Sequence, residues 1–407
     1  MSNQRHDANG PLAGIRVLDL SRILAGPTCT QLLGDYGADI IKIEKPGSGD
    51  DTRKWGPPYV QDRAGNHTSE SAYYLSANRN KRSVAIDIST DRGAGLVREL
   101  LQSCDILIEN FKVGGLKKYG LDYATLQATK PDLIYCSISG FGQNGPNANR
   151  PGYDLMAQGF GGIMSLTGEP DGPPTKVAVG VADIMCGMYA ATAILAALRH
   201  RDQSGEGQYI DIGLVDTQIA WLANEGCNYL TSGDLPKRRG NQHPNIVPYQ
   251  VFEVSDGHVI VAVGNDAQFA RFCSVIGQDL LARDPRYTAN EARVANRDSL
   301  IDLLSAALRK LTKSFVLDGL EQASVPCGPI NDLAELFVND QVAAREMKIS
   351  MPHPLAASGR VELIGNPVKF SKTPVTYRHA PPTCGAATDE VLGELSAVTN
   401  KQKSTSV

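Results

Sequence analysis

The stretch Gly14–Glu44, GIRVLDLSRILAGPTCTQLLGDYGADIIKIE, contains two short apolar segments separated by a helical one. The segments Gly14–Leu20 (GIRVLDL) and Ala38–Glu44 (ADIIKIE) are typical of buried β-strands, because apolar and β-branched residues dominate both. Between them, a helical pattern runs from about Pro27 to Asp35. A strand, a helix and a second strand of these lengths predict a βαβ unit and therefore parallel strands.

The same alternation continues through the N-terminal half of the chain. Further strands are predicted at 83–87, 106–109, 133–138 and 208–214, and helices at 92–102 and 184–198. The second of these helices carries apolar residues on nearly every face, which indicates a buried helix. We therefore expect an α/β fold with a doubly wound, mostly parallel, Rossmann-like sheet. In such a sheet, ligand loops follow the carboxyl ends of the strands.

The pattern changes after about residue 227. Segments 250–254 and 258–263 flank Ser255-Asp256-Gly257, which predicts a β-hairpin, and helical segments follow at 267–276 and 297–310. We expect a smaller α+β domain in this part of the chain. The predicted division is 1–225 for the N-terminal part of the large domain, 226–330 for a linker and the small domain, and 331–407 for a return linker and the rest of the large domain.

Composition and charge argue against several classes of protein. The 407-residue chain has a formal net charge of −4 and a pI near 6.0, so no global positive field attracts nucleic acid or an acidic membrane. Eight cysteines occur singly, which argues against a zinc site and a disulfide framework. The polar first ten residues and the lack of an uncharged apolar run of about 20 residues argue against a signal peptide and a membrane span. We expect a cytoplasmic protein that binds no metal, nucleic acid or membrane.

A glycine motif, Gly140–Gly145 (GFGQNG), follows a predicted strand and matches G-x-G-x-x-G. The dinucleotide-binding fingerprint also needs a helix that begins there, so that its N-terminus meets the pyrophosphate. Pro146 and the turn-rich segment 147–151 follow instead. We interpret the motif as a plain glycine loop and reject a nicotinamide-dependent dehydrogenase.

Asp183, in the segment Gly180–Asp183 (GVAD), immediately precedes the predicted buried helix. Its local sequence favours a helix N-cap, since aspartate accepts hydrogen bonds from free backbone N–H groups there. The alternative is a nucleophile, because an ionised carboxylate held at a helix N-terminus can attack an activated acyl group.

Three other segments carry polar residues that have both structural and functional interpretations. Asp154 follows the glycine loop and, taken alone, is typical of a turn. In the loop 47–56 (GSGDDTRKWG), Arg53 and Trp55 could recognise and cover a carboxylate, or belong to a solvated loop. His243 lies in the glycine-bearing loop 238–244, where surface structure is more common than acid–base catalysis.

Taken together, segments between Leu12 and about Leu395 resemble CoA-transferase family III, also called the carnitine/formyl-CoA transferase family. The segments that carry the resemblance include 17–27 (VLDLSRILAGP), 37–46 (GADIIKIEKP), 78–83 (NRNKRS), 109–111 (ENF), 180–183 (GVAD), 187–198 and 205–211 (GEGQYID). Their number and order make the resemblance specific. It implies that Asp183 is the catalytic nucleophile and reverses the local preference for a cap.

The resemblance also implies where coenzyme A (CoA) and the acyl group bind. The implied CoA-binding residues, all in the first domain, are Ile23, Leu24, Ala25, Lys45, Ile86, Asn110, Phe111 and Lys118. The implied acyl pocket contains Trp55, Tyr73, Tyr153 and Asp154. We take the loop at Gly240 as a candidate lid. Charge alone suggests that Arg53, or the pair Arg238 and Arg239, holds the distal carboxylate of a dicarboxylate substrate.

The implied activity is transfer of CoA from succinyl-CoA, or a similar acyl-CoA, to a small dicarboxylic acid such as glutarate or hydroxymethylglutarate. The implied route passes through an aspartyl mixed anhydride and an aspartyl-CoA thioester. It needs no tightly bound cofactor and no metal, because the thioester energy is conserved and CoA is carried as a substrate. An interlocked homodimer is expected from the resemblance alone.

Three alternatives stay open. A 2-methylacyl-CoA racemase shares the resemblance, but it needs a His–Asp pair, and Tyr153 stands at the position of that histidine. The second is a CoA-transferase for another acid, such as itaconate, mesaconate, malate, citramalate or oxalate. A CoA-binding protein without turnover is the third.

Overall fold

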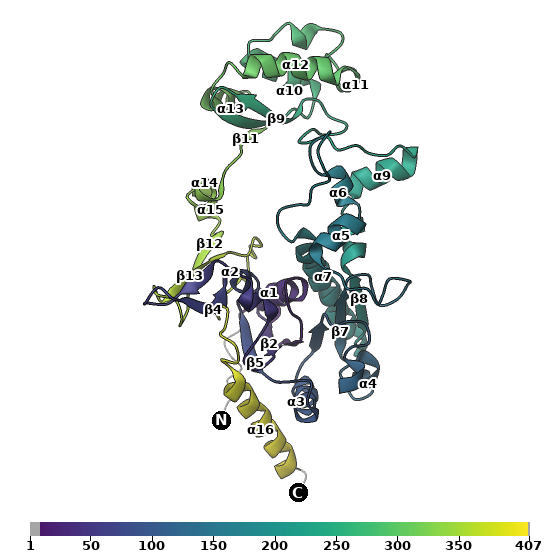
Figure 1. Cartoon of the computed structure of the whole chain (residues 1–407), viewed down its shortest axis with the longest axis vertical. Helices are drawn as coiled ribbons and strands as arrows, with labels where there is room; N and C mark the ends of the chain where they lie inside the picture. Colours follow the sequence, from purple (N-terminus) through teal and green to yellow (C-terminus); the bar gives the residue numbers. More distant parts are fainter. Residues whose placement is uncertain (1–8, 406–407) are drawn as a thin grey trace. The chain divides into compact units, whose positions relative to one another are not determined.

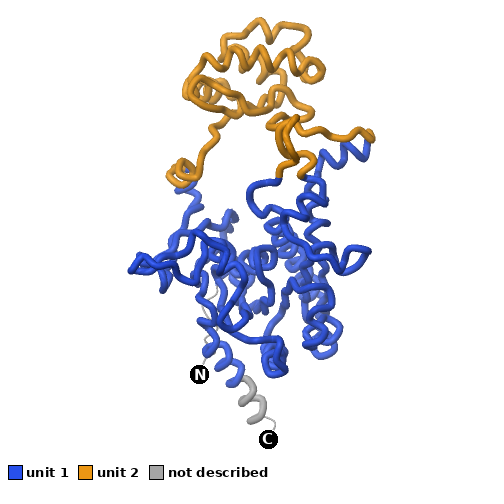
Figure 2. Tube along the Cα trace, viewed as in Figure 1, with its two compact units in different colours: residues 1–163, 176–231, 341–407 blue, residues 164–175, 232–340 orange. Residues whose placement is uncertain are grey.

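The computed structural model describes residues 9–405, with side chains described as far as residue 397. The chain divides into two compact units, which Figure 2 shows in different colours. Unit 1 contains the described residues up to Ile163, the segment Lys176–Thr231 and the chain from Gln341 onward. Unit 2 contains Met164–Thr175 and Ser232–Asp340. The sequence patterns did not indicate that 164–175 belongs with the second unit, and the predicted domain boundaries stay a prediction.

Unit 1 is built on a six-stranded parallel sheet (Figure 1). In their order across the sheet, the strands are β5 (Lys81–Ala85), β2 (Asp39–Glu44), β1 (Arg16–Asp19), β6 (Ile106–Glu109), β7 (Ile134–Ser139) and β8 (Tyr209–Gly213). The six strands predicted from the sequence are all present, and each pairs in parallel with its neighbours. The order of the strands reverses between β1 and β6. Parallel sheets of this kind bind ligands at such a switch point.

Helices cover both faces of this sheet, as the doubly wound arrangement predicts. One face packs against α1 (Ala25–Asp35) and α7 (Val181–Ser204), and the other against α3 (Asp91–Leu101), α4 (Tyr123–Gln127) and α16 (Thr388–Thr405). Successive strand residues point to opposite faces, so Val17 joins the first core and Leu18 the second. Both cores are continuous along the sheet, which explains why the central strands β1, β2, β6 and β7 carry apolar residues on both faces.

Helix α7 is the buried helix that the sequence predicts. By length and composition alone it could cross a membrane, but 61% of its most apolar window is buried inside the structure. A β-carbon at Gly187 would lie only 2.5 Å from the carbonyl oxygen of Ala25, so the backbones of α7 and α1 meet there. We therefore interpret α7 as a core helix of unit 1.

The remaining elements of unit 1 form its loops, two small antiparallel sheets and the return of the chain. They are η1 (Asp51–Lys54), β3 (Tyr59–Gln61), β4 (His67–Ser71), α2 (Ala72–Ser76), η2 (Lys117–Tyr119), α5 (Asp154–Phe160), α8 (Leu214–Ala220), β12 (Lys348–Pro352) and β13 (Arg360–Ile364). Near the unit boundaries lie α6 (Ile163–Leu166), α9 (Ala223–Ser232) and α15 (Asp340–Ala344).

The C-terminal segment returns to the edge of the large sheet at β5. Ala387 donates its N–H to the carbonyl of Ser83 at 2.9 Å, and Arg82 pairs with Glu394 at 2.6 Å. Strand β5 is thus covered by residues more than 300 positions away in the sequence.

Unit 2 contains a three-stranded antiparallel sheet and its own hydrophobic core. Its strands are β9 (Tyr249–Val254), β10 (Gly257–Ala262) and β11 (Cys327–Pro329), in the order β11-β10-β9. Its helices are α10 (Asp266–Val275), η3 (Leu281–Arg283), α11 (Asn290–Ala295), α12 (Arg297–Leu308), α13 (Lys313–Gln322) and α14 (Leu333–Phe337). The predicted hairpin around Asp256 is confirmed by the pairing of β9 with β10.

Candidate active site

The loops at the carboxyl ends of four neighbouring strands carry most of the residues predicted to bind CoA. Ile23, Leu24 and Ala25 follow β1, Lys45 follows β2, Ile86 follows β5, and Asn110 and Phe111 follow β6. Because these strands are parallel, their carboxyl ends lie at the same edge of the sheet. Lys118 lies further along the chain in η2, with its Nζ 4.7 Å from the ring centroid of Tyr119. The structure brings these residues to one edge, and their contact with CoA stays a prediction.

Asn110 joins the two loops at the switch point. Its Oδ1 accepts the backbone N–H of Arg22 at 2.9 Å, and its Nδ2 donates to the carbonyl of Arg22 at 2.7 Å. The next residue, Ile23, has a φ of 73°, which a β-branched residue rarely adopts. Unusual backbone of this kind is concentrated at functional sites.

Asp183 lies in the first turn of α7, but it does not cap that helix. The helix begins at Val181 after an N-cap at Gly180, so Asp183 is its third residue, and the interpretation of Asp183 as an N-cap is wrong. Asp154 provides the missing acceptor from outside the helix. Its Oδ1 accepts the N–H of Ala182 at 2.8 Å. Asp154 therefore provides the acceptor at the start of α7, and the Asp183 side chain is left free for another role.

The Asp183 carboxyl group is buried, with 8% of the residue exposed. Within residues 9–397 it accepts no hydrogen bond. Burial and, second, the negative charge of Asp154 raise the pKa of Asp183 to about 7. We expected the helix N-terminus to keep this group fully ionised, and burial outweighs that effect. A buried, unpaired carboxyl group that titrates near neutrality is typical of a functional site.

Gln158 orients Asp154 and was not singled out from the sequence. It is fully buried in α5, and its Nε2 donates to Asp154 Oδ2 at 2.7 Å. Its Oε1 accepts the N–H of Val177 at 2.8 Å, which ties α5 to the segment before α7. The available sequence signal is the spacing of four residues between Asp154 and Gln158, which places both on one side of a helix.

Two aromatic residues of the predicted acyl pocket lie near these carboxyl groups. The rings of Trp55 and Tyr73 pack edge to face with centroids 5.1 Å apart. Burial and then the charges of Asp183 and Asp154 raise the pKa of Tyr73 to about 12, so its hydroxyl stays protonated at neutral pH. Tyr153, the N-cap residue of α5, is 59% exposed. The structure thus brings Tyr73, Asp154 and Asp183 together, while their roles stay predictions.

Arg53 has a structural role, and the expectation that it holds a substrate carboxylate is wrong. It is 3% exposed, and its Nε and Nη2 donate to the two carboxylate oxygens of Glu44 at 2.8 and 2.7 Å. Its Nη1 donates to Glu70 at 2.6 Å, and its Nη2 also donates to the hydroxyl of Tyr74 at 2.6 Å. All its donor groups are engaged, so none is left for a ligand.

A second buried ion pair connects the two loops that the site needs. Lys42 is fully buried in β2, and its Nζ donates to Asp50 Oδ2 at 2.9 Å and to the carbonyl of Ser21 at 2.8 Å. Asp50 Oδ1 accepts the N–H groups of Thr52 at 3.0 Å and Ile23 at 3.3 Å. Although burial opposes ionisation, Lys42 and these hydrogen bonds lower the pKa of Asp50 to about 2. A lysine inside an apolar strand was the sequence signal for this pair, and it was missed.

The predicted lid lies in unit 2. Gly240 has a φ of 58°, and its N–H donates to the carbonyl of Gly168 at 3.1 Å. Arg238 holds the same segment, since its Nε and Nη2 donate to the carbonyls of Glu169 and Gly172 at 3.2 and 2.6 Å. The function of this loop as a lid stays a prediction.

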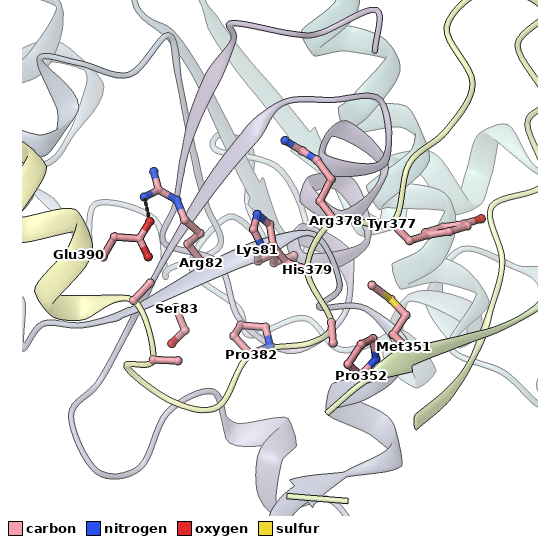
Figure 3. Close-up of a pocket in the computed structure, with 13 residues that line it drawn as sticks. Lys81, Arg82, Ser83, Met351, Pro352, Tyr377, Arg378, His379, Pro382 and Glu390 are labelled. Carbon is pink, nitrogen blue, oxygen red and sulfur yellow. Dashed lines mark hydrogen bonds and ion pairs between the residues drawn. The ribbon is translucent and has the colours of Figure 1, made fainter. Parts of the chain in front are cut away.

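A cavity of about 370 Å³ lies beside β5, where the C-terminal segment returns (Figure 3). None of the predicted site residues lines it. Figure 3 shows Arg82 at its edge, paired with Glu390. This ion pair is 3.0 Å long, and the same guanidinium also pairs with Asp39 at 2.6 Å. Because the charge of Arg82 is already neutralised, we assign no function to this cavity. Among the described residues, no group of three or more His, Cys, Asp or Glu side chains is placed to hold a metal ion.

Comparison with known proteins identifies the family. The sequence profile of CoA-transferase family III matches residues 12–388. A succinate–glutarate CoA-transferase of Agrobacterium fabrum is 49% identical over 389 residues, which covers 95% of this chain and 96% of that protein. The human succinyl-CoA:glutarate CoA-transferase is 40% identical, with 95% and 86% of the two chains covered. The crystal structure of a CaiB/BaiF family protein from Brucella suis superimposes with a TM-score of 0.84 at 47% identity, over 95% of this chain and 100% of that one. The chain is therefore an enzyme that belongs to CoA-transferase family III.

Proposed function

We propose that this enzyme transfers CoA from succinyl-CoA to glutarate or a similar small dicarboxylic acid, with Asp183 as the nucleophile. The relatives named above support the choice of substrates. The observation that carries the assignment of Asp183 is its environment. The carboxyl group is buried, is unpaired within residues 9–397 and lies near Asp154 and Tyr73.

The chemistry conserves the thioester energy in four steps. The Asp183 carboxylate attacks the thioester carbonyl of succinyl-CoA, and CoA thiolate leaves, which forms a succinyl–Asp183 anhydride. The thiolate attacks the Asp183 carbonyl and releases succinate, which leaves an Asp183–CoA thioester. Glutarate attacks this thioester and expels the thiolate again, which gives a glutaryl–Asp183 anhydride. The thiolate then attacks the glutaryl carbonyl, releases glutaryl-CoA and restores the Asp183 carboxylate.

The surroundings of Asp183 suit these steps. Anhydrides react readily with water, so a buried nucleophile protects them. The edge-to-face pair of Trp55 and Tyr73 adds apolar surface near the carboxyl group. The Tyr73 hydroxyl, protonated at neutral pH, is available to donate a hydrogen bond to the oxyanion that forms in each step.

The test is incubation with succinyl-CoA and a panel of acids, followed by mass spectrometry of the CoA products and of the protein. The panel contains glutarate, hydroxymethylglutarate, itaconate, mesaconate, malate, citramalate and oxalate. We expect glutaryl-CoA and a CoA adduct on the peptide that contains Asp183, and we expect Asp183→Asn to form neither.

Other outcomes favour the alternatives. Transfer to a different acid would keep the chemistry and replace glutarate. Deuterium uptake at carbon 2 of a branched acyl-CoA, without transfer to any acid, would indicate a racemase and contradict the proposal. Binding of CoA without either reaction would indicate a non-catalytic protein.

We further propose a homodimer in which unit 2 is the smaller α+β domain of each chain. Apolar side chains are exposed on α5, α7 and α8, and they are Leu155, Phe160, Met188, Tyr189, Leu195 and Ile219. Apolar surface gathered on neighbouring helices is typical of an interface. A cytoplasmic location, the absence of nucleic-acid and membrane partners, and the absence of a bound metal or cofactor stay predictions.

A further inference from the structure

Asp19, the last residue of β1, is a buried carboxylate that takes no part in the four steps proposed above. It is fully buried at the switch point of the sheet, and its two oxygens bind the two flanks of the loop 21–25. Oδ1 accepts the N–H and the hydroxyl of Ser21 at 2.8 and 2.6 Å, and Oδ2 accepts the hydroxyl of Thr30 in α1 at 2.6 Å. One side chain therefore joins the start of the loop to the helix that follows it.

Two buried lysines keep Asp19 ionised. Although burial raises its pKa, the charges of Lys42 and Lys81, together with the two hydroxyl groups, hold that pKa below its usual value. Lys81 Nζ lies 3.5 Å from Asp19 Oδ2 and donates to the carbonyl of Pro27 in α1 at 3.0 Å. Lys42 donates to the carbonyl of Ser21 at 2.8 Å. Hydrogen bonds to charged groups are stronger than neutral ones, so both flanks of the loop are firmly held.

The middle of the loop has anchors of its own. The N–H and the carbonyl of Arg22 bind the Asn110 side chain, and the N–H of Ile23 donates to Asp50 Oδ1 at 3.3 Å. The φ of 73° at Ile23 costs free energy for a β-branched residue, and such a backbone persists only where the surrounding bonds enforce it. The conformation of the loop therefore depends on the buried groups that bind it.

The end of the loop meets the helix that carries the proposed nucleophile. A β-carbon at Gly180, the N-cap of α7, would lie 2.9 Å from Leu24 Cδ2 and 3.8 Å from Asp154 Cγ. Leu24 therefore packs beside the start of α7, and Asp183 is the third residue of that helix. The loop thus lies between the switch point, where sheets of this kind bind ligands, and Asp183.

We propose that Asp19 is the positioning residue of the loop 21–25, and that it holds this loop in the conformation that binds CoA before CoA arrives. The proposal rests on the predicted CoA contacts of residues 23–25 and on the proposed function. Asp19 is fully buried and acts only through Ser21 and Thr30. A loop that is already ordered loses less conformational entropy on binding. Weakening the contacts of Asp19 therefore lowers the affinity for CoA.

The test weakens one contact of Asp19 at a time. Asp19→Asn is too severe, because it leaves the buried Lys81 without its ion-pair partner. Thr30→Val removes the donor to Oδ2 at nearly constant size, Thr30→Ser restores it, and Ser21→Ala removes the hydroxyl donor to Oδ1. We expect Thr30→Val and Ser21→Ala each to raise the calorimetric Kd of CoA by about 3- to 10-fold, the range for one net hydrogen bond. Thr30→Ser should restore the wild-type value.

Two further measurements separate positioning from a general loss of stability. Hydrogen exchange at the amides of the loop 21–25 should be faster in free Thr30→Val than in the free wild type, and CoA should slow it in both. The kcat/KM for succinyl-CoA should fall with the affinity. The kcat/KM for glutarate should stay unchanged, because CoA is already bound covalently to Asp183 when the acid reacts.

Thr217→Val is the matched control. Thr217 is a buried threonine of α8, and its hydroxyl donates to the carbonyl of Leu214 at 3.0 Å. The change removes a buried hydroxyl from the same unit without touching the loop 21–25. We expect it to leave the Kd of CoA unchanged.

Four results would overturn the proposal. An unchanged Kd of CoA in Thr30→Val and Ser21→Ala would show that Asp19 does not set the affinity. A change in only one of them would assign the effect to that residue. An equal rise in Thr217→Val would assign it to lost stability. Unchanged exchange of the loop on addition of CoA to the wild type would place CoA elsewhere.

The proposal and the proposed function can fail separately. If the wild-type enzyme transfers CoA to no acid of the panel, the proposed function fails. The titrations with CoA and the hydrogen exchange need no acceptor acid, so they still decide the role of Asp19.

Discussion

The Asp183 side chain combines two properties that conflict at neutral pH, because it must be ionised to attack and is buried. With its pKa at about 7, we expect kcat/KM for succinyl-CoA to fall as the pH drops through that value. Asp154→Asn removes the second cause of the raised pKa of Asp183. The acidic limb of the pH–rate curve therefore moves to lower pH in this variant. Rates measured from about pH 5.5 to 8.5 test this. Identical pH–rate curves for the wild type and Asp154→Asn would show that Asp154 does not raise the pKa of Asp183.

Because Asp183 is buried, its ionised form lowers the free energy of unfolding. The pKa is raised in the folded state, so the protonated form is favoured there, and the cost appears as pH rises from about 4 to about 7. Asp183→Asn removes it. We expect the free energy of unfolding to increase at pH 8 by up to roughly 4 kcal/mol and to be unchanged at pH 4. Urea unfolding at both pH values measures this. Asp302→Asn, on an exposed position of α12, is the control. An equal effect at both pH values would argue against an ionisation origin.

At the scale of elements, the contact between α1 and α7 depends on Gly187. A β-carbon there would lie 2.5 Å from the Ala25 carbonyl oxygen and 2.8 Å from Thr28 Cβ, so Gly187→Ala forces the helices apart. We expect a loss of about 1–3 kcal/mol and a higher KM for succinyl-CoA, because α1 begins beside the predicted CoA loop. Gly95→Ala in α3 is the matched control. Its β-carbon would meet only Arg98 Nη2, at 3.9 Å, which is ordinary van der Waals contact, so this change adds about 1 kcal/mol of stability. Thermal unfolding of the wild type and both variants measures these two opposite changes in stability.

The loops after β1 and β2 are joined through Lys42 and Asp50. Lys42→Met leaves Asp50 buried without its ion-pair partner, and Asp50→Asn leaves Lys42 with only the charges of Asp19 and Glu44. We expect each single change to cost about 3–5 kcal/mol and the double change to cost less than their sum. A double-mutant cycle by denaturant unfolding measures the coupling energy. Additive effects would show that the two side chains act independently.

At the scale of the whole molecule, the exposed apolar side chains of α5, α7 and α8 are expected to be covered by a second chain. Light scattering after size exclusion should then give twice the chain mass of 43.6 kDa. Leu195→Glu and Ile219→Glu, placed on two of these helices, should shift the mass toward that of one chain. A single-chain mass for the unaltered enzyme would contradict the dimer.

Much of the sheet could be predicted because its signals are local. The prediction placed the ends of four strands, β1, β2, β6 and β7, within about two residues of those observed. A short apolar run between turn residues can be recognised as a strand without knowing what packs against it. The edge strand β5 begins at Lys81, two residues earlier than predicted. Lys81 and Arg82 are buried there because they pair with residues distant in the sequence, such as Pro27 and Glu394, which the local sequence does not show. The assignment of Asp183 to the active site was not a local signal. It depended on the family resemblance that many segments carry together.

Hydrophobic periodicity and turn residues are local signals. They therefore predict the alternation of strands and helices in the N-terminal half, the buried helix α7 and the loops at the carboxyl edge of the sheet. Which charges are free follows only from the folded chain. Arg53 is engaged by Glu44, Glu70 and Pro382, the last more than 300 residues away, whereas Asp183 accepts no hydrogen bond within residues 9–397. The reason is physical: whether a polar group is paired or buried depends on which distant segments fold against it, and that follows from packing of the whole chain.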